Sequence, residues 1–403
     1  MTQKTQVIQY CSTKGKPCGI ATYTEMTARA HKQSIVGSLK ELKECKSPIT
    51  HLHIQHEFGM MSSTELGEIF AYCKEKGIHC YVTMHTVVPL PTLPEYLRFR
   101  LLRPFGGKLT LTSVPKGLAL LAFQIWEDCI WLLHLLLRGN LRLWKRWNSL
   151  KEKVSTKTSQ DKAQKIFPQG WQWTRENPDY DMGSYLHFRT SQKTIVQSAE
   201  KIVVHCTEAK EALQNMGANS IEVIPHGVLF APTSPHRHSH EDGKTHVGCF
   251  GFMHPHKCLL EIIDACAQVP NLSLHIYAST EHCGLDDRYR RQVERKANQH
   301  EWIELCTDHL ELDEVIWKLS ACDVNVWFAD VPGGMSVSGS IRQYIAAGRP
   351  IIASDTIMIS DIRDAVEVVP PQDVHALAQV LSQYREANEE SSIKWAVQLA
   401  WEK

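Results

Sequence analysis

Short apolar runs alternate with amphipathic helical patterns along most of this 403-residue chain. In the first half, apolar runs predict buried strands of a parallel sheet at 50–58, 78–88, 200–207 and 219–228. Amphipathic patterns lie between them, for example at 65–77 and 207–218, and Gly217 closes the second. Strands that alternate with helices form a parallel sheet with helices on its faces. The sequence therefore predicts an α/β, doubly wound domain.

The alternation breaks once and then restarts. Residues 231–245 are rich in Pro, Ser, His and charged residues, which indicates a linker. After the linker, strands are predicted at 246–253, 272–279, 303–307, 324–329 and 350–354, with helices between them. We expect two Rossmann-like doubly wound domains, 1–230 and 246–388, that face a cleft at the carboxyl ends of their strands. A terminal helix is predicted over 389–403.

A long insertion interrupts the first domain over 95–190. Over a hundred residues separate the predicted strand that ends at His85 from the next one, far more than a crossover connection needs. Residues 117–147 are apolar and rich in Trp, and 97–153 hold eleven basic residues against three acidic ones. This composition favours a helix that lies in a membrane interface, so peripheral membrane contact is predicted through about 97–150. The alternative is a helical insertion packed on the protein or in an oligomer. A spanning helix would carry fewer charges.

Composition excludes some classes of protein. Lys plus Arg equals Asp plus Glu at 44 each, which argues against a nucleic-acid partner and against an acidic tail. The thirteen cysteines are scattered singly, as expected for reduced thiols in the cytoplasm. The first twelve residues lack the charged head and apolar run of a signal peptide. We therefore expect a cytoplasmic protein on the inner face of a membrane.

Residues 337–356 combine a turn, a helix and a strand. Ser338, Gly339 and Ser340 open the helical pattern, and Gly348 and Pro350 end it. A helix start leaves backbone N–H groups unpaired and carries the positive end of the helix dipole. The segment therefore predicts an anion site.

Six segments resemble, in order along the chain, the motifs of one enzyme family. They are 16–30, 53–60, 82–87, 223–228, 251–257 and the helix after Val337. Their sequences include KPCGIATYTE, HIQHEFGM, VTMHTV, VIPHGV and GFMHPHK. Together they are similar to the retaining GT-B glycosyltransferases of family 4. The resemblance implies the GT-B fold, a nucleoside-diphosphate-sugar donor and transfer with retention of anomeric configuration.

The resemblance also implies roles for individual residues. Lys257 would supply a positive charge to the departing pyrophosphate, and His85 would lie beside the donor sugar, so these two are the predicted catalytic residues. The predicted donor-binding residues are Gly19, His254, Lys257, Gly334, Ser336, Ser338, Gly339 and Gln343. Alternatively, His85 is held by a backbone carbonyl, Gly19 is a plain turn glycine and Lys257 lies on the surface. Cations are disfavoured at helix starts, which favours the functional interpretation of Lys257.

His56 and Glu57 end the strand next to that of His85 and are predicted on the acceptor side. Glu57 either binds an acceptor hydroxyl or pairs with a basic neighbour. Pro225, His226 and Gly227 are interpreted mainly as a structural exit from a strand.

The chain departs from the family at several positions. The family has two glutamates eight positions apart, and Met335 and Gln343 stand in their places. Gln343 still offers an amide to ribose hydroxyls, whereas Met335 cannot replace a carboxylate. In the phosphate loop, His254 replaces an arginine and Cys258 replaces a glycine. His254 is a cation for only part of the time near neutral pH.

Neither a cofactor nor a metal is predicted. His51 and His53 share one strand face and His56 points to the other, and the remaining histidines lie in loops without ligand spacing. The predicted function is transfer of a sugar from a nucleoside-diphosphate sugar to a saccharide or lipid-linked acceptor at a membrane surface. No carboxylate is placed as a nucleophile, so we expect front-face attack assisted by the leaving phosphate. The alternative is a non-catalytic GT-B scaffold that retains at most nucleotide binding.

Overall fold

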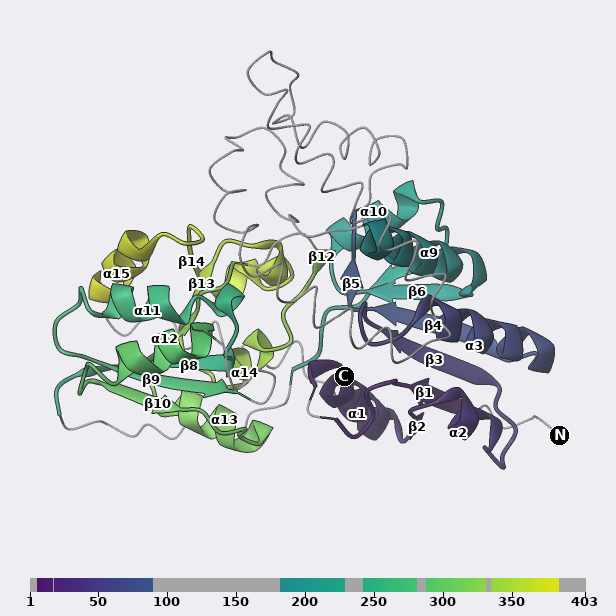
Figure 1. Ribbon diagram of the computed structural model, residues 1–403, viewed down its shortest axis with the longest axis horizontal. Coiled ribbons are helices and arrows are strands. Elements are labelled where there is room, and N and C mark those ends of the chain that lie inside the picture. The colour runs from purple at the N-terminus through teal and green to yellow at the C-terminus, as the bar shows by residue number, and fades with distance from the viewer. Residues whose placement is uncertain are drawn as a thin grey trace, which may run out of the picture. The chain divides into compact units, whose positions relative to one another are not determined.

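The computed structural model describes residues 6–16, 18–89, 182–228, 242–280, 288–330 and 335–383. These residues form two parallel six-stranded sheets and one two-stranded ladder (Figure 1). The unit that contains both sheets comprises Met1–Val88 and Gln192–Lys403. This arrangement confirms the predicted α/β class.

The first sheet has the strand order β2-β1-β3-β4-β6-β7. Its strands are β1 (Val7–Tyr10), β2 (Ser34–Val36), β3 (His51–His56), β4 (His79–Met84), β6 (Lys201–Val204) and β7 (Ile221–Val223). Its helices are α1 (Gly19–His31), α2 (Leu39–Lys43), α3 (Ser63–Lys76), α9 (Met182–Ser198) and α10 (Thr207–Asn215). The order reverses between β1 and β3, so the crevice at the carboxyl ends of these two strands is where such sheets bind ligands.

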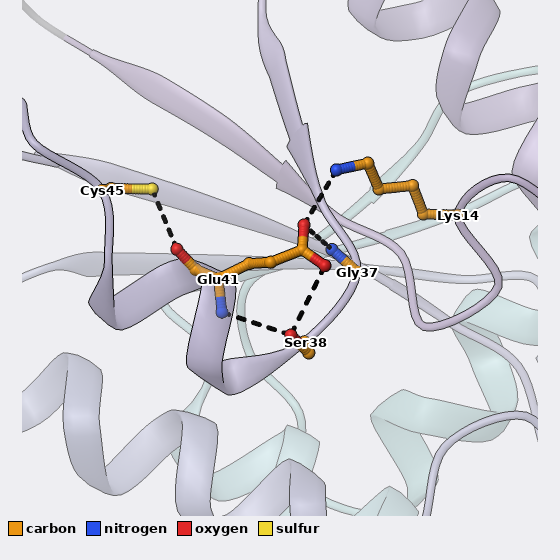
Figure 2. A network of polar contacts seen from close by, with 5 residues as sticks. All are labelled: Lys14, Gly37, Ser38, Glu41 and Cys45. Carbon is orange, nitrogen blue, oxygen red and sulfur yellow. Dashed lines mark hydrogen bonds and ion pairs between the residues drawn. The ribbon is translucent and has the colours of Figure 1, made fainter.

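Two helices of this half begin with the same capping device. The Ser38 hydroxyl accepts from the Glu41 N–H at the start of α2, and the Ser62 hydroxyl accepts from the Glu65 N–H at the start of α3. Around α2 the Glu41 carboxylate also accepts from the Gly37 N–H and pairs with Lys14 at 2.8 Å (Figure 2). Both helix starts are therefore fixed by local side chains.

The second sheet has the order β10-β9-β8-β11-β13-β14. Its strands are β8 (Thr245–Phe252), β9 (Leu272–Ser279), β10 (Ile303–Cys306), β11 (Val324–Trp327), β13 (Ile351–Ser354) and β14 (Glu367–Val369). Its helices are α11 (Leu259–Cys266), α12 (Arg288–Ala297), α13 (Leu312–Ser320), α14 (Ile341–Ala346) and α15 (Val374–Gln383), with 3₁₀ turns η2 (Pro255–Lys257), η3 (Ile357–Ile359) and η4 (Arg363–Ala365). The order reverses between β8 and β11.

Both faces of the second sheet are covered. Along β13, Ile352 belongs to the apolar cluster that includes α11 and α15, whereas Ile351 and Ala353 belong to the cluster that includes α13 and α14. Successive strand residues point to opposite faces, so the near-continuous apolar strands predicted from the sequence reflect burial on both sides.

The ladder joins two short strands from distant parts of the chain. In β5 (Thr86–Val87), Thr86 pairs with Ser336 and Val87 with Met335 of antiparallel β12 (Met335–Ser336). The strand predicted over 78–88 is thus two strands that are interrupted at His85. This interruption corrects the prediction: the His85 N–H bonds to the His56 carbonyl of the neighbouring strand, and the chain then leaves the sheet.

Several predictions lie outside the described residues. They are the insertion over 95–190 up to residue 181, the linker over 231–245 up to residue 241, Gly334, and the terminal helix over 389–403. Membrane contact through about 97–150 also falls there. Within the described ranges, no helix combines the length and the apolar character needed to cross a bilayer.

Candidate active site

Lys257 lies where the second sheet reverses its order. It is the last residue of η2, which follows β8. Its Nζ donates to Ser340 Oγ at 3.4 Å and lies 5.4 Å from the centroid of the Trp327 ring. Burial lowers the pKa of Lys257 to about 8. No carboxylate of the described residues forms an ion pair with Lys257, so its charge is available to an anion.

Ser340 connects the phosphate loop to the start of α14. Its Oγ accepts from Trp327 Nε1 at 3.1 Å as well as from Lys257, and it lies 3.0 Å from Ser338 Oγ. Trp327 ends β11 and is 2 % exposed. Ser340 was predicted only as part of the helix start that forms the anion site, and Trp327 was not predicted as a site residue. A polar-tipped aromatic at the carboxyl end of a strand beside the order reversal is the sequence signal that identifies Trp327.

The loop around η2 contains a residue with left-handed backbone at one of the positions where the chain departs from the family. Cys258 adopts a left-handed conformation with φ 48° and ψ 39°, in which glycine is the least strained residue. His254 precedes η2, and its ring stacks on His256 with centroids 5.5 Å apart. Burial, with a contribution from the Lys257 charge, lowers the pKa of His256 to about 4. Lys257 is therefore the cation that this loop offers at neutral pH.

The turn before α14 packs against a histidine. A Cβ added at Gly339 would lie 3.6 Å from His226 Nε2. Ser338 is 2 % exposed, so its hydroxyl serves the Ser340 contact from a buried position. Gln343 is half-buried on the first turn of α14, where its N–H bonds to the Ser340 carbonyl. Gly334, the remaining predicted donor residue of this loop, lies outside the described residues.

Gly19 is the first residue of α1 and follows the first-sheet strand β1. Cys18 precedes it in an extended conformation, and no side chain caps the helix. A Cβ added at Gly19 would meet no atom of the described residues within 4 Å. The first N–H groups of a 13-residue helix thus begin beside open space at the order reversal of the first sheet.

His85 lies in a buried cluster of rings at the end of β4. The centroid of the Tyr23 ring is 4.7 Å from His85, 4.8 Å from His226 and 5.3 Å from His205. Burial, then the neighbouring His205, lowers the pKa of His85 well below the usual range. Among the described residues, the partner of the His85 ring is a side-chain amide and no backbone carbonyl: Nε2 lies 2.9 Å from Gln55 Oε1. His205, which the sequence analysis did not single out, completes this neutral cluster.

The two predicted acceptor-side residues differ in burial. His56 is fully buried, and its ring packs edge to face on Phe58 with centroids 4.9 Å apart. Glu57 accepts from Thr86 Oγ1 at 2.9 Å and from the Phe58 N–H at 3.0 Å. Burial raises the pKa of Glu57 to about 7, although these hydrogen bonds oppose the shift. Among the described residues, no basic side chain hydrogen-bonds to Glu57, so the predicted pairing with a basic neighbour is not seen there.

The β5–β12 ladder brings the predicted donor and acceptor sides together. Thr86 donates to Glu57 and also pairs with Ser336. Met335, one position earlier, packs against the apolar core of the first sheet. The position where the family has a carboxylate is therefore filled by an apolar contact.

A buried ion pair joins α14 to the segment that follows η3. Arg342 Nη2 lies 2.6 Å from Asp361 Oδ2, and the two side chains are 2 % and 7 % exposed. The Nε and Nη1 atoms of Arg342 have no hydrogen-bond partner among the described residues.

The part of the chain that the structure describes contains no group of three or more His, Cys, Asp or Glu side chains that would hold a metal ion.

Comparison with known proteins gives similarity in structure. No family model and no curated protein matches the chain. Sucrose-phosphate synthase from Thermosynechococcus elongatus superposes with a TM-score of 0.62 at 13% identity, over 98% of this chain and 96% of that one. Anabaena HepE in complex with UDP and glucose gives 0.52 at 13% identity, over 98% and 96% of the two chains.

A third structure concerns the stereochemistry of transfer. Trehalose-6-phosphate synthase, studied with bisubstrate glycomimetics for glycosyltransfer with retention, gives a TM-score of 0.51 at 11% identity, over 94% of this chain and 73% of that one. At these identities the likeness concerns the fold. It confirms the prediction from the sequence: this chain has the two-sheet fold of the GT-B glycosyltransferases.

Proposed function

We propose that this protein is a glycosyltransferase that moves a sugar from a nucleoside-diphosphate sugar to a saccharide or lipid-linked acceptor. The observation that carries the proposal is Lys257: a half-buried lysine that has no carboxylate partner among the described residues and lies beside the turn that opens α14. A cation in this position suits the pyrophosphate of the donor. The similarity in fold to structures that hold UDP and glucose supports the same assignment.

The chemistry needs charge stabilisation more than covalent catalysis. As the bond between the anomeric carbon and the phosphate oxygen breaks, negative charge grows on the pyrophosphate. Lys257 would stabilise that charge, together with backbone N–H groups at the starts of α1 and α14. With retention, the acceptor oxygen attacks from the same face, and its proton passes to the leaving phosphate oxygen. The work on trehalose-6-phosphate synthase supports this stereochemistry by analogy.

Glu57 and His85 would orient the two sugars. The Glu57 carboxyl, with a pKa of about 7, accepts or donates a hydrogen bond near neutral pH and suits an acceptor hydroxyl. Neutral His85 would lie against the donor sugar. His56 is enclosed in the core and has no part in this proposal.

The first test measures donor binding. Calorimetric titration with UDP, GDP, ADP and their glucose conjugates is expected to select one nucleotide. Lys257→Ala should weaken that binding about 10- to 100-fold, because a hydrogen bond to a charged group contributes about 1.5–3 kcal/mol. Lys318→Ala is the matched control, since Lys318 also lies over an aromatic ring, 5.3 Å from the Tyr277 centroid. Equal losses in both variants, or no binding across the panel, would contradict the proposal.

Met335 favours a second candidate, a non-catalytic scaffold. Its side chain packs on the apolar core where the family has a carboxylate. A scaffold would bind nucleotide without consuming the sugar nucleotide. An enzyme would release free nucleoside diphosphate in the presence of a mixture of glucosyl acceptors, whereas a scaffold would not. This measurement therefore separates the two candidates.

The membrane part of the proposal depends on residues 97–150. Their basic, Trp-rich sequence supports peripheral contact with anionic lipid on the cytoplasmic face. Sedimentation with vesicles that contain phosphatidylglycerol should recover the full chain. Deletion of residues 100–150 should abolish that recovery, and unchanged partitioning would contradict the membrane proposal.

A further inference from the structure

A line of polar side chains crosses the interior of the first sheet. Gln9 in β1 and Gln55 in β3 are 1 % and 2 % exposed, although their strand neighbours Ile8, Tyr10 and Ile54 are core residues. Buried amides cost free energy unless their hydrogen bonds are made. Two glutamines at the centres of adjacent strands therefore require partners.

The partners form one continuous chain that ends at His85. Gln9 Nε2 donates to Gln33 Oε1 at 2.6 Å, and Gln55 Nε2 donates to Gln9 Oε1 at 2.8 Å. Gln55 Oε1 then lies 2.9 Å from His85 Nε2. Gln9 Nε2 also lies 3.3 Å from His53 Nδ1, and His53 Nε2 lies 2.7 Å from Thr83 Oγ1.

The pleat explains why these side chains meet. Gln9 is directly opposite His53, and Gln55 is directly opposite Thr83. His53 and Gln55 are two positions apart in β3, and His85 follows the end of β4 two positions after Thr83, so these side chains meet on one side of the sheet. The chain of amides follows from strand register.

The direction of each hydrogen bond decides where the protons lie. Gln55 donates through Nε2 to Gln9, so its carbonyl oxygen faces His85 and accepts. The proton between them must therefore be on His85 Nε2. Gln9 likewise donates to His53 Nδ1, which leaves the His53 proton on Nε2 for Thr83. Both imidazoles are neutral, in accord with a pKa for His53 lowered to about 4 by burial.

We propose that Gln55 is a positioning residue: as the last link of the chain Gln33–Gln9–Gln55, it holds His85 in the tautomer that carries its proton on Nε2 and keeps Nδ1 as a hydrogen-bond acceptor. Reversal of one amide alone would set two donors or two acceptors face to face. The tautomers of His85 and His53 are thus coupled through Gln9.

The consequence for the substrate rests on the proposed function. An imidazole whose Nδ1 can only accept a hydrogen bond suits a sugar hydroxyl, which donates. It disfavours a carboxylate in the same place, which would set two acceptors against each other. The site is therefore built for a neutral hexosyl donor in preference to a uronic acid.

The test is nitrogen NMR of the full chain labelled with ¹⁵N-histidine. Long-range ¹H–¹⁵N correlations distinguish a protonated Nε2 from a protonated Nδ1 in each neutral ring. The wild type is expected to show His85 and His53 both protonated on Nε2. His85 protonated on Nδ1 would overturn the proposal, and this result needs no variant to fold.

Three substitutions of buried glutamine separate positioning from general destabilisation. Gln55→Met should turn the single His85 tautomer into a mixture and leave His53 unchanged, whereas Gln9→Met should alter both. Gln192→Met is the matched control, because Gln192 is fully buried and none of its hydrogen-bond partners among the described residues belongs to the Gln33–Gln9–Gln55 network. Its Oε1 accepts from the Val88 N–H at 2.7 Å, and its Nε2 donates to the Val88 carbonyl at 3.0 Å and to Met216 Sδ. An unchanged His85 pattern in Gln55→Met, or an equal change in Gln192→Met, would overturn the proposal.

Failure of the proposed function can be told apart from failure of this inference. If no sugar nucleotide binds in calorimetry, the glycosyltransferase proposal falls, and the tautomer result stands by itself. If UDP-glucose binds at least tenfold more tightly than UDP-glucuronate in the wild type and this ratio shrinks in Gln55→Met, both are supported.

Discussion

The two sheets present opposite chemistry beyond the carboxyl ends of their strands. At the first sheet, burial holds the pKa values of His85 and His226 well below their usual range and that of His205 at about 4, so the rings are neutral. At the second sheet, Lys257 has a pKa of about 8 and keeps its charge at neutral pH. Although the two sheets have similar topologies, the strand ends of the first carry neutral rings and those of the second carry a lysine cation.

This difference matches the two ends of a sugar nucleotide. Neutral imidazoles, amides and a phenol hydrogen-bond to hydroxyl groups without requiring charge, whereas a lysine beside helix starts favours phosphate. Under the function proposed above, we expect the neutral rings to meet the sugar and Lys257 to meet the pyrophosphate.

The largest effect is expected from the buried charge behind the cation-bearing loop. Arg342→Met should lower the free energy of unfolding by about 3–5 kcal/mol, since it leaves the Asp361 carboxylate buried and unpaired. Gln192→Met, a loss of buried neutral hydrogen bonds in the first half, should cost about 1–3 kcal/mol. Urea denaturation at pH 7 measures both.

The Arg342 variant should recover partly in acid. Burial raises the pKa of Asp361 even with Arg342 present, so without the arginine the carboxyl takes up a proton more readily. Equal costs for the charged and the neutral substitution would remove the contrast between the two halves.

A second prediction tests the cation itself. Affinity for UDP should be constant below pH 8 and fall by up to about tenfold per pH unit above it, because free Lys257 loses its proton there and the bound phosphate favours the charged form. Lys257→Arg stays charged and should flatten this decline. Calorimetry between pH 6.5 and 9.5 makes the measurement, and a flat wild-type profile would contradict it.

A third prediction concerns the carboxyl group at the edge of the neutral half. The folded pKa of Glu57, about 7, lies above the unfolded value of about 4.3, so the protein binds this proton more tightly when folded. Glu57 therefore lowers stability as pH rises through this window. Glu57→Gln should gain about 1 kcal/mol relative to wild type between pH 4.5 and 7.5, after a discount for solvent screening. Thermal unfolding at both pH values decides the sign.

The smallest effect is expected for an exposed pair. Lys14 and Glu41 are each 44% exposed, so Lys14→Met should change stability by less than about 1 kcal/mol (Figure 2). The lysine helps to lower the pKa of Glu41, and the stability from this pair is present above about pH 4.3 and lost as pH falls through the folded value. A loss of stability comparable to that of Arg342→Met would show that burial does not control how much an ion pair contributes to stability.

Hydrophobic patterning predicted the central strands well. β3, β4, β6, β9, β11 and β13 lie within predicted apolar runs, and β8 begins one residue before its predicted run, because central strands of doubly wound sheets are buried on both faces. The edge strands β2 and β14, with three residues each, and the four-residue β1 were not predicted. The β5–β12 ladder has two residues per strand and is fixed by tertiary contact alone.

The site was less accessible from sequence. Lys257, His85 and Gly19 follow strand ends, which the topology rule makes visible. Gln9 and Gln55 were passed over because they interrupt apolar strands singly, although a glutamine inside a buried strand is itself a signal of a polar network. Arg342 sits in an apolar helix and finds Asp361 nineteen positions later, a pairing that no local pattern reveals.

The β5–β12 ladder also bears on how the protein is made. It joins Thr86 to Ser336, about 250 positions further along the chain. Closing so long a loop costs entropy that the earlier folding of each sheet can reduce, so this ladder should form late. During synthesis, β5, whose Thr86 hydrogen-bonds to Glu57, leaves the ribosome long before its partner strand β12. A nascent chain would therefore complete each sheet first and acquire the shared edge of its site only near the end of synthesis.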